Sequence, residues 1–311
     1  MMIHPGVMGI DVSKAALDVF DAAVGRAERF ANAAAAIEDL AARCAREGVF
    51  VVFEATGRYD RLLRLGLTAA GVKFARVNPL AARDFARAAG FLAKTDALDA
   101  RMLAAMAQAL RPAAQQSVAA ERERLALLHK RRDQLVATRQ QERTRRHDCD
   151  DPGIAASLEA HLGWLDAAIA QMETAIRALL AAHRELECQQ KLLTSAPGVG
   201  PVTALTLIAL LPELGQRSSK TIAALAGLAP LNRDSGERRG RRAIRGGRKR
   251  VRDALYMAAL AAARSHTRFS AAYRALRAAG KPAKLALIAI ARKLLVTLNA
   301  IARDQRAFQN G

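Results

Sequence analysis

The chain has 311 residues, of which 51% are hydrophobic and only 4% aromatic, so it is long enough for two domains with cores of their own. Its 49 Lys and Arg residues outnumber 29 Asp and Glu residues, and the resulting net charge of +20 indicates a polyanionic partner. The apolar runs at 202–211 and 285–291 are too short to span a bilayer, and no signal-peptide pattern opens the sequence, so we expect no membrane attachment.

The first ninety residues predict three strands followed by alternating helices and strands. Strands are expected at 7–12, 17–20 and 28–31, a helix at 33–46, and a wholly apolar, buried strand at 49–53. A helix to about residue 70, a strand at 72–77 and a helix at 80–90 complete the pattern. This order fits the ribonuclease-H-like (RuvC-like) α/β sheet, in which the first strand lies beside the fourth.

Four carboxylates fall where that fold would bring them together. Asp11 and Glu54 stand at the ends of two predicted strands, and Asp96 and Asp99 lie one helical turn apart within the sequence FLAKTDALDAR. Clustered carboxylates repel unless a cation lies between them, and oxygen ligands suit Mg²⁺, so we predict a magnesium site, with two ions as in many phosphoryl-transfer enzymes.

Two other interpretations of these residues stay open. Asp96 could cap the helix and Asp99 could complement the helix dipole without binding a metal. The same strands could also open an actin-like ATPase fold, although the sequence after residue 110 lacks the second sheet and phosphate loop of that fold. We therefore place a RuvC-like catalytic domain at 1–110.

Residues 111–190 predict a helical hairpin. Apolar residues in its second arm alternate spacings of four and three, which is typical of a coiled coil. The two arms could pack on each other, or the apolar stripe could form a dimer seam. The first arm ends in basic residues, and we predict that Arg143, Arg145 and Arg146 contact nucleic acid.

Residues 191–311 predict a mainly helical domain. The sequence SAPGVG has the turn of a helix-hairpin-helix element, in which Gly198 and Gly200 would let backbone N–H groups approach a phosphate. The segment 231–252 holds ten basic and two acidic residues with no core pattern, as expected for a loop that binds phosphates. The predicted contacts there are Arg238, Arg239, Arg241, Arg242, Arg245, Arg248, Lys249 and Arg250. Composition alone suggests only a turn role for Ser235.

Five motifs in this order resemble the DEDD transposases of the insertion sequence 110 family. They are GIDVSK, FEATGRY, KTDALDA, SAPGVGPVTA and GLAPLNRDSGERRG. The resemblance covers nearly the whole chain and implies that Asp11, Glu54, Asp96 and Asp99 are metal ligands. It also implies that Ser235 is the nucleophile. The chain departs from the family pattern at Asp60, where an aromatic residue is common.

The resemblance implies a Mg²⁺-dependent DNA recombinase that works through a serine-linked DNA intermediate. Its implied partners are DNA, a structured guide RNA and further copies of the chain in a dimer or tetramer, in a prokaryotic cytoplasm and nucleoid. Two alternatives use the same residues differently. A Holliday-junction-resolvase-like nuclease would use the four carboxylates with water as nucleophile, and a non-catalytic protein would only bind nucleic acid.

Overall fold

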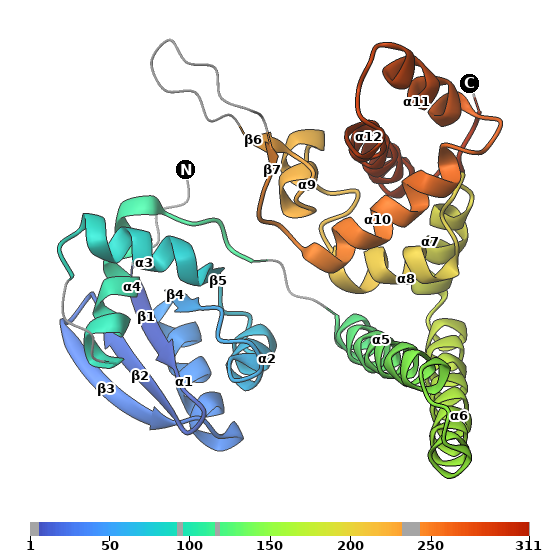
Figure 1. The fold of residues 1–311 in the computed structure, drawn as a ribbon. Helices are drawn as coiled ribbons and strands as arrows, with labels where there is room; N and C mark the ends of the chain where they lie inside the picture. Colours follow the sequence, from blue (N-terminus) through green and yellow to red (C-terminus); the bar gives the residue numbers. More distant parts are fainter. Residues whose placement is uncertain (1–5, 92–95, 116–118, 232–242, 311) are drawn as a thin grey trace. The chain divides into compact units, whose positions relative to one another are not determined.

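The computed structural model describes residues 6–91, 96–115, 119–231 and 243–310 (Figure 1). For residues 96–98 and 231 it describes the backbone only. The chain divides into two compact units, residues 1–117 and 118–311. The first unit holds a five-stranded mixed sheet flanked by helices, whereas the second is almost wholly helical. The predicted combination of an α/β part with a larger helical part is confirmed.

The sheet of the first unit has the strand order β3-β2-β1-β4-β5. The strands are β1 (Gly6–Val12), β2 (Ala16–Asp21), β3 (Arg26–Ala31), β4 (Val49–Glu54) and β5 (Phe74–Val77). The first three run antiparallel as a meander, and β1 pairs in parallel with β4, which pairs in parallel with β5. The prediction that the first strand lies beside the fourth is therefore confirmed.

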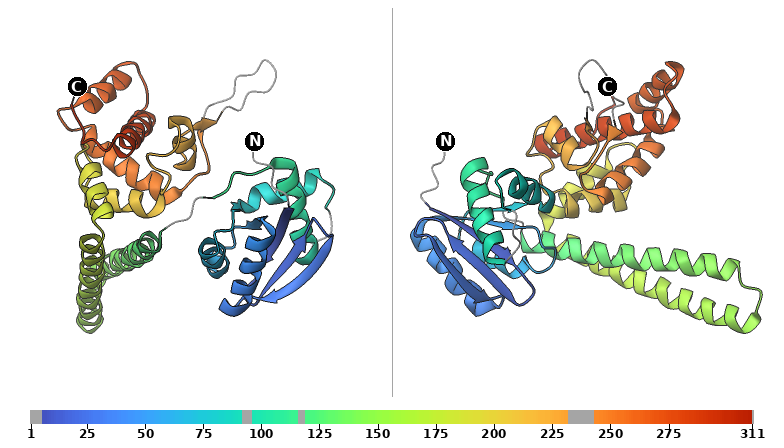
Figure 2. Two further views of the ribbon diagram at one scale, coloured as in Figure 1. Left: turned by 180° about the vertical axis from the view of Figure 1, so that it is seen from behind. Right: turned by 60° about the vertical axis from the view of Figure 1, so that its left-hand side comes forward.

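Helices cover both faces of this sheet (Figures 1 and 2). The helices are α1 (Ala34–Glu47), α2 (Arg61–Ala69), α3 (Pro79–Ala88) and α4 (Asp96–Leu110). Side chains of α1 and α2 form a core with one face of β1 and β4, which includes Ile10 and Phe53. Side chains of α3 and α4 form a second core with the opposite face, which includes Phe50 and Val52. Strand β4 is buried on both sides, as its uninterrupted apolar sequence predicts.

Two helix starts are explained by their capping residues. Asn78 accepts a hydrogen bond from the Leu80 backbone N–H (2.8 Å) at the start of α3, and Pro79 fills the first helical position. Asp151 caps the second arm of the hairpin in the same way, accepting from the Ile154 N–H at 2.9 Å. In both helices a proline directly follows the capping residue, so each helix start has a local cause.

The second unit begins with two long helices that lie side by side, α5 (Ala120–His147) and α6 (Pro152–Ala182) (Figure 2). Leu135, Leu165 and Ile169 are buried between them. The periodic stripe in α6 therefore serves, at least in part, to pack the two arms together. A dimer seam on the remaining face stays a prediction.

The rest of the second unit packs around a single large core. Its helices are α7 (Arg184–Thr194), α8 (Pro201–Leu210), α9 (Ser219–Leu225), α10 (Lys249–Ala262), α11 (Arg268–Ala278) and α12 (Ala283–Asp304). Two short strands, β6 (Pro230–Leu231) and β7 (Ala243–Ile244), pair antiparallel. Helix α12 is long and apolar enough to cross a membrane, but 56% of its most apolar window is buried within this core. Its composition is that of a central core helix.

Candidate active site

Two of the predicted carboxylates lie at neighbouring strand ends. In the parallel pairing of β1 with β4, Ile10 is the partner of Phe53, so Asp11 and Glu54 follow side by side at the same edge of the sheet. Ile10 and Phe53 point into the core beneath α1 and α2. Because successive side chains alternate between faces, Asp11 and Glu54 belong to the opposite face, which α4 covers.

Helix α4 lies directly against β1 at Gly9. A Cβ atom added to Gly9 would lie 2.0 Å from the Ala100 carbonyl oxygen and 2.6 Å from the Ala104 backbone nitrogen. Asp99 immediately precedes Ala100, and Asp96 is the first residue of the same helix, although its side chain lies outside the described part. The close approach at Gly9 therefore holds the helical turn of the DxxD pair against the strand that carries Asp11.

We predict that Gly9→Ala disrupts this arrangement. The new methyl group collides with helix backbone, which cannot rotate away, so α4 must move off β1. Overpacking of this kind destabilises a protein by roughly 1–3 kcal/mol, and displacement of the DxxD turn should also lower any activity of the site. Thermal unfolding of the variant measures the first effect.

Gly6→Ala is the matched control on the same strand. A Cβ atom at Gly6 comes no closer than 3.6 Å to its nearest neighbour, which is ordinary van der Waals contact. Equal stability of the two alanine variants would show that the packing of α4 on β1 does not require glycine at position 9.

Asp18 is a fifth carboxylate at this edge, and it was absent from the sequence-based set. It is the antiparallel partner of Asp11 on β2, so the two side chains share a face of the sheet. Asp18 is only 7% exposed, its Oδ1 atom lies 3.4 Å from an Arg29 guanidinium nitrogen, and its Oδ2 atom has no hydrogen-bond partner among the described residues. Its place opposite Asp11 is a consequence of strand register, which the expected strand at 17–20 could have indicated.

These residues fit a hard cation by their chemistry. All are carboxylates, and the buried Asp18 oxygen without a partner is a polar group that a cation or water could satisfy. Among the described residues, however, no three His, Cys, Asp or Glu side chains are close enough to form a metal-ligand group. Strand register places the carboxylates of Asp11, Asp18 and Glu54 on one face of the sheet, but they do not form a complete metal-coordination site.

The surroundings of Asp60 account for the presence of an acidic residue where the family commonly has an aromatic one. It is fully buried just before α2, where its Oδ1 atom accepts from Arg64 Nε at 3.2 Å and its Oδ2 atom accepts from Arg76 Nε at 2.6 Å. Arg76 lies on β5 and pairs with Phe53 of β4, next to Glu54. The carboxylate thus ties the loop after Glu54 to the sheet edge and to α2.

Ser235 and four predicted nucleic-acid contacts lie outside the described residues. These contacts are Arg238, Arg239, Arg241 and Arg242.

The start of α10, which follows this segment, is anchored by ion pairs. Arg248 donates to both carboxylate oxygens of Glu213 (2.6 Å each) and to the Leu210 carbonyl oxygen (3.0 Å). Burial alone would raise the pKa of Glu213, but the hydrogen bond and charge of Arg248 outweigh it and hold that pKa below its usual value.

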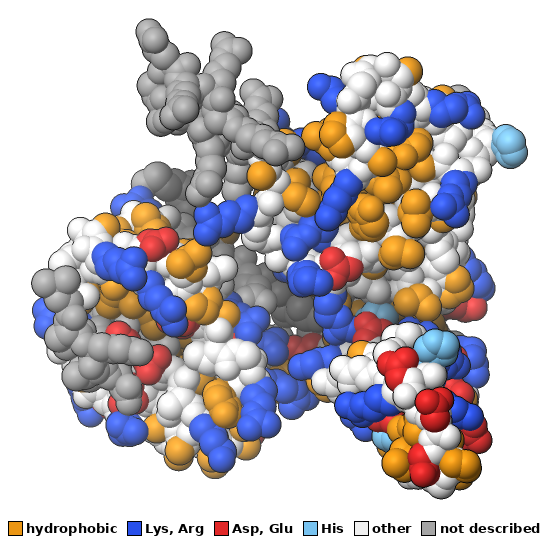
Figure 3. All heavy atoms as spheres, in the orientation of Figure 1, with side chains coloured by type: hydrophobic (Ala, Val, Ile, Leu, Met, Phe, Trp, Pro, Cys, Tyr) orange, Lys and Arg blue, Asp and Glu red, His pale blue; other side chains and the backbone are white. Residues whose placement is uncertain are grey.

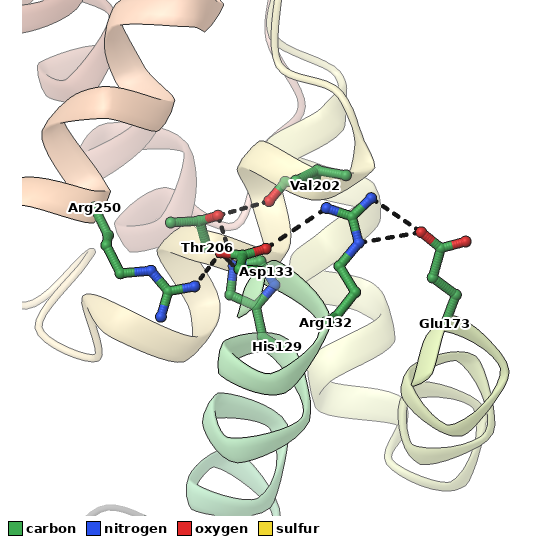
Figure 4. A network of polar contacts seen from close by, with 7 residues as sticks. All are labelled: His129, Arg132, Asp133, Glu173, Val202, Thr206 and Arg250. Atoms are coloured by element: carbon green, nitrogen blue, oxygen red, sulfur yellow. Dashed lines mark hydrogen bonds and ion pairs between the residues drawn. The ribbon is translucent and has the colours of Figure 1, made fainter. Parts of the chain in front are cut away.

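A polar network, buried only at His129 and Thr206, joins the helical hairpin to the helix that follows this segment (Figure 4). Asp133 of α5 pairs with Arg250 of α10, and His129, one turn earlier, lies 2.9 Å from the Thr206 hydroxyl of α8. Arg132 continues the network to Glu173 of α6. Burial lowers the pKa of His129, and the charges of Arg250 and Arg132 add to this effect while Asp133 opposes it. A neutral imidazole at neutral pH follows from that shift.

Several other predicted nucleic-acid contacts have partners within the chain. Arg145 pairs with Glu142 (2.5 Å), Arg146 with Glu159 (2.8 Å) and Lys249 with Asp253 (2.6 Å). The Arg146 and Lys249 pairs are exposed, and pairs of this kind are weak and can exchange for a phosphate, whereas Glu142 is buried. Arg143 and Arg245 have no carboxylate within 4 Å among the described residues.

The two glycines of the SAPGVG turn differ in their surroundings. Gly198 has a φ of +77°, and a Cβ atom there would lie 2.3 Å from the Ala258 carbonyl oxygen of α10. Glycine is needed at this position for packing within the chain. Gly200 precedes α8 and has open space around its Cα atom. The predicted phosphate contact of this turn stays a prediction for both.

Comparison with known proteins gives a consistent family relationship. A family model described as Transposase IS116/IS110/IS902 family matches residues 190–274, and an IS110-type DEDD model described as Transposase matches residues 8–149. The chain is 30% identical to a pilin gene-inverting protein of Moraxella lacunata over 262 residues, which cover 83% of this chain and 81% of that protein. It is also 32% identical over 161 residues to an insertion element IS110 uncharacterized 43.6 kDa protein of Streptomyces coelicolor, covering 51% of this chain and 38% of that one.

Proposed function

The chain belongs to the IS116/IS110/IS902 transposase family, and from this we propose that it cuts and rejoins DNA strands at the carboxylate edge of its first unit. One observation carries the proposal. Asp11 and Glu54 end adjacent parallel strands on the face covered by α4, the helix that begins with Asp96 and Asp99. Metal-dependent phosphoryl transfer uses such a concentration of oxygen ligands beside the scissile phosphate.

In this proposal Asp11, Glu54, Asp96 and Asp99 hold Mg²⁺. The bound ions would polarise the scissile phosphate and neutralise charge on the departing oxygen. Asp18 faces Asp11 across the strands and would add negative charge to the same edge.

Ser235 is the proposed nucleophile, on the basis of the GLAPLNRDSGERRG motif. Its hydroxyl oxygen forms a bond to phosphorus while the bond to the 3′ oxygen breaks. The strand end leaves as a 3′ hydroxyl, which gains the proton that the serine loses, and the phosphate stays on Ser235 as an ester. Attack on this ester by a 3′ hydroxyl of another strand rejoins the DNA without an external energy source.

The proposal has two further parts that concern partners. Ser235 and the carboxylates lie in different units of the chain, so one complete site could combine the first unit of one copy with the second unit of another copy in a dimer or tetramer. A structured guide RNA would select the DNA, and the basic end of α5 and the segment 231–252 offer positive charge for it.

A covalent protein–DNA adduct tests the proposal. Purified protein is incubated with Mg²⁺, candidate guide RNA from the gene's flanks and labelled element-end duplex, and the products are separated on a denaturing gel. We expect an adduct that is absent in Ser235→Ala and in Asp96→Ala.

The outcomes separate the two enzymatic mechanisms. Cleavage that persists in Ser235→Ala without any adduct would assign the chain to the resolvase-like nucleases, with water as nucleophile. DNA binding by the wild-type protein without any cleavage would point to a protein that only binds nucleic acid.

A further inference from the structure

A groove between α11 and α12 lies outside the site described above. It has a volume of about 600 Å³ and is lined by the cationic side chains Arg268, Arg292 and Lys293 and by the apolar side chains Ala272, Ala289 and Val296. These residues lie beyond the SAPGVG turn and the segment 231–252, the two places in 191–311 for which the sequence predicts phosphate binding.

The segment that forms the groove is strongly basic. Residues 264–306 contain ten Lys and Arg residues and one acidic residue, Asp304, which gives a net charge of +9. Asp304 is engaged with Arg303 at 2.8 Å. In the upper right of Figure 3, where α11 and α12 lie, blue side chains lie among exposed hydrophobic ones and red ones are few. Nearly half of the net charge of the chain is therefore carried by residues 264–306.

Arg268 is held in place across the groove. Its guanidinium lies 5.5 Å from the ring centroid of Phe269 and 5.2 Å from that of Phe308, and it donates a hydrogen bond to the Thr297 hydroxyl of α12 at 3.3 Å. These contacts fix a cation that has no carboxylate partner among the described residues. A fixed cation loses less conformational entropy when it binds an anion.

Arg292 and Lys293 provide the second cationic element, one helical turn from Val296 on α12. Neither has a carboxylate within 4 Å in the described ranges of the chain. The remaining lining is apolar except for the Thr297 hydroxyl, which accepts the hydrogen bond from Arg268. The groove therefore presents charge that is complementary to an anionic ligand and is not neutralised within the chain.

We propose that this groove binds the phosphate backbone of duplex DNA without reading its sequence. The proposal rests on the proposed function, which makes DNA the substrate. Single-stranded nucleic acid is a poorer fit, because such sites stack bases on exposed aromatic rings and Phe269 is only 2% exposed. Lys and Arg contacts to phosphate oxygens carry no sequence information, so binding to the backbone alone would not depend on base sequence.

The salt dependence of DNA binding tests the groove. The dissociation constant for a duplex of arbitrary sequence is measured at several salt concentrations with Arg292→Gln/Lys293→Gln, in an Asp11→Asn background that separates binding from strand cleavage. Loss of two phosphate contacts should reduce the slope of log K against log salt by about 1.8, since each contact contributes about 0.9.

Arg274→Gln/Lys281→Gln is the matched control, because it removes the same charge from exposed positions of the second unit that do not line the groove. An unchanged slope in the groove variant, or an equal reduction in the control, would overturn the proposal. Preferential loss of binding to an RNA duplex or to anionic vesicles would overturn the assignment to DNA. Thermal unfolding checks that both variants fold.

These outcomes are distinct from failure of the proposed function. If the wild-type protein forms no adduct and cuts no DNA, yet the groove variant still shows the reduced slope, the strand-transfer proposal fails and the groove stands. If the adduct forms and the slope is unchanged, the reverse holds.

Discussion

Asp11→Asn is expected to lower strand cleavage by at least about 10³-fold while leaving the fold intact. The amide keeps the size of the carboxylate and one oxygen but removes the negative charge, so the edge loses an anionic ligand beside Glu54. Cleavage of labelled duplex under single-turnover conditions measures the effect.

The stability of the same variant distinguishes loss of chemistry from loss of structure. Asp11 and Asp18 are directly opposite each other, and like charges in that relation destabilise a sheet. Asp11→Asn should therefore unfold at the same temperature as the wild type or at a higher one. Asp39→Asn, at an exposed position of α1, is the control and should retain full cleavage. Full cleavage by Asp11→Asn would remove this carboxylate from the mechanism.

Asp60→Ala is expected to destabilise the first unit by about 3 kcal/mol, at the lower end of values for breaking a buried ion pair. The substitution leaves the guanidinium groups of Arg64 and Arg76 without their shared partner. Both side chains are partly exposed, at 19% and 30%, and water can reach them, which is why the lower end applies. A shift of roughly 10 °C or more in the unfolding temperature of this unit follows for a domain of this size.

Two comparisons make this prediction specific. Asp84→Ala removes an exposed carboxylate from α3 in the same unit, and substitutions at such positions usually change stability by less than about 0.5 kcal/mol. The only tryptophan, Trp164, lies in the second unit, so its fluorescence transition should not move in either variant. Equal unfolding temperatures for Asp60→Ala and Asp84→Ala would show that the buried pair is not a source of stability.

The sequence predicted the elements of the first unit because each has a strong local signal. The apolar run at 49–53 can only be satisfied by burial on both faces, which placed β4 at the centre of the sheet. The order of strands then fixed β1 as its neighbour, and with it the adjacency of Asp11 and Glu54. Asn78 and Asp151 marked helix starts through hydrogen bonds to backbone only two or three residues away.

Partners distant in sequence were decided only by the tertiary structure. The sequence does not show which side chains lie beside a charged residue in the folded chain. It therefore predicted only phosphate binding for Arg248 and Arg250, whereas the structure pairs them with Glu213 and Asp133. Asp60 read as a departure from the family pattern, because Arg76 lies sixteen residues away on another strand.

The sequence by itself thus determined the family, the strand order of the first unit and the candidate carboxylates, since those depend on local patterns and motifs. Three features became visible only in the tertiary structure: Asp18 lies opposite Asp11, α4 packs closely against Gly9, and a basic groove lies between α11 and α12. The physical reason is that strand register, close backbone approach and charge pairing are relations between segments far apart in the chain. Their energies depend on distances that no local pattern contains.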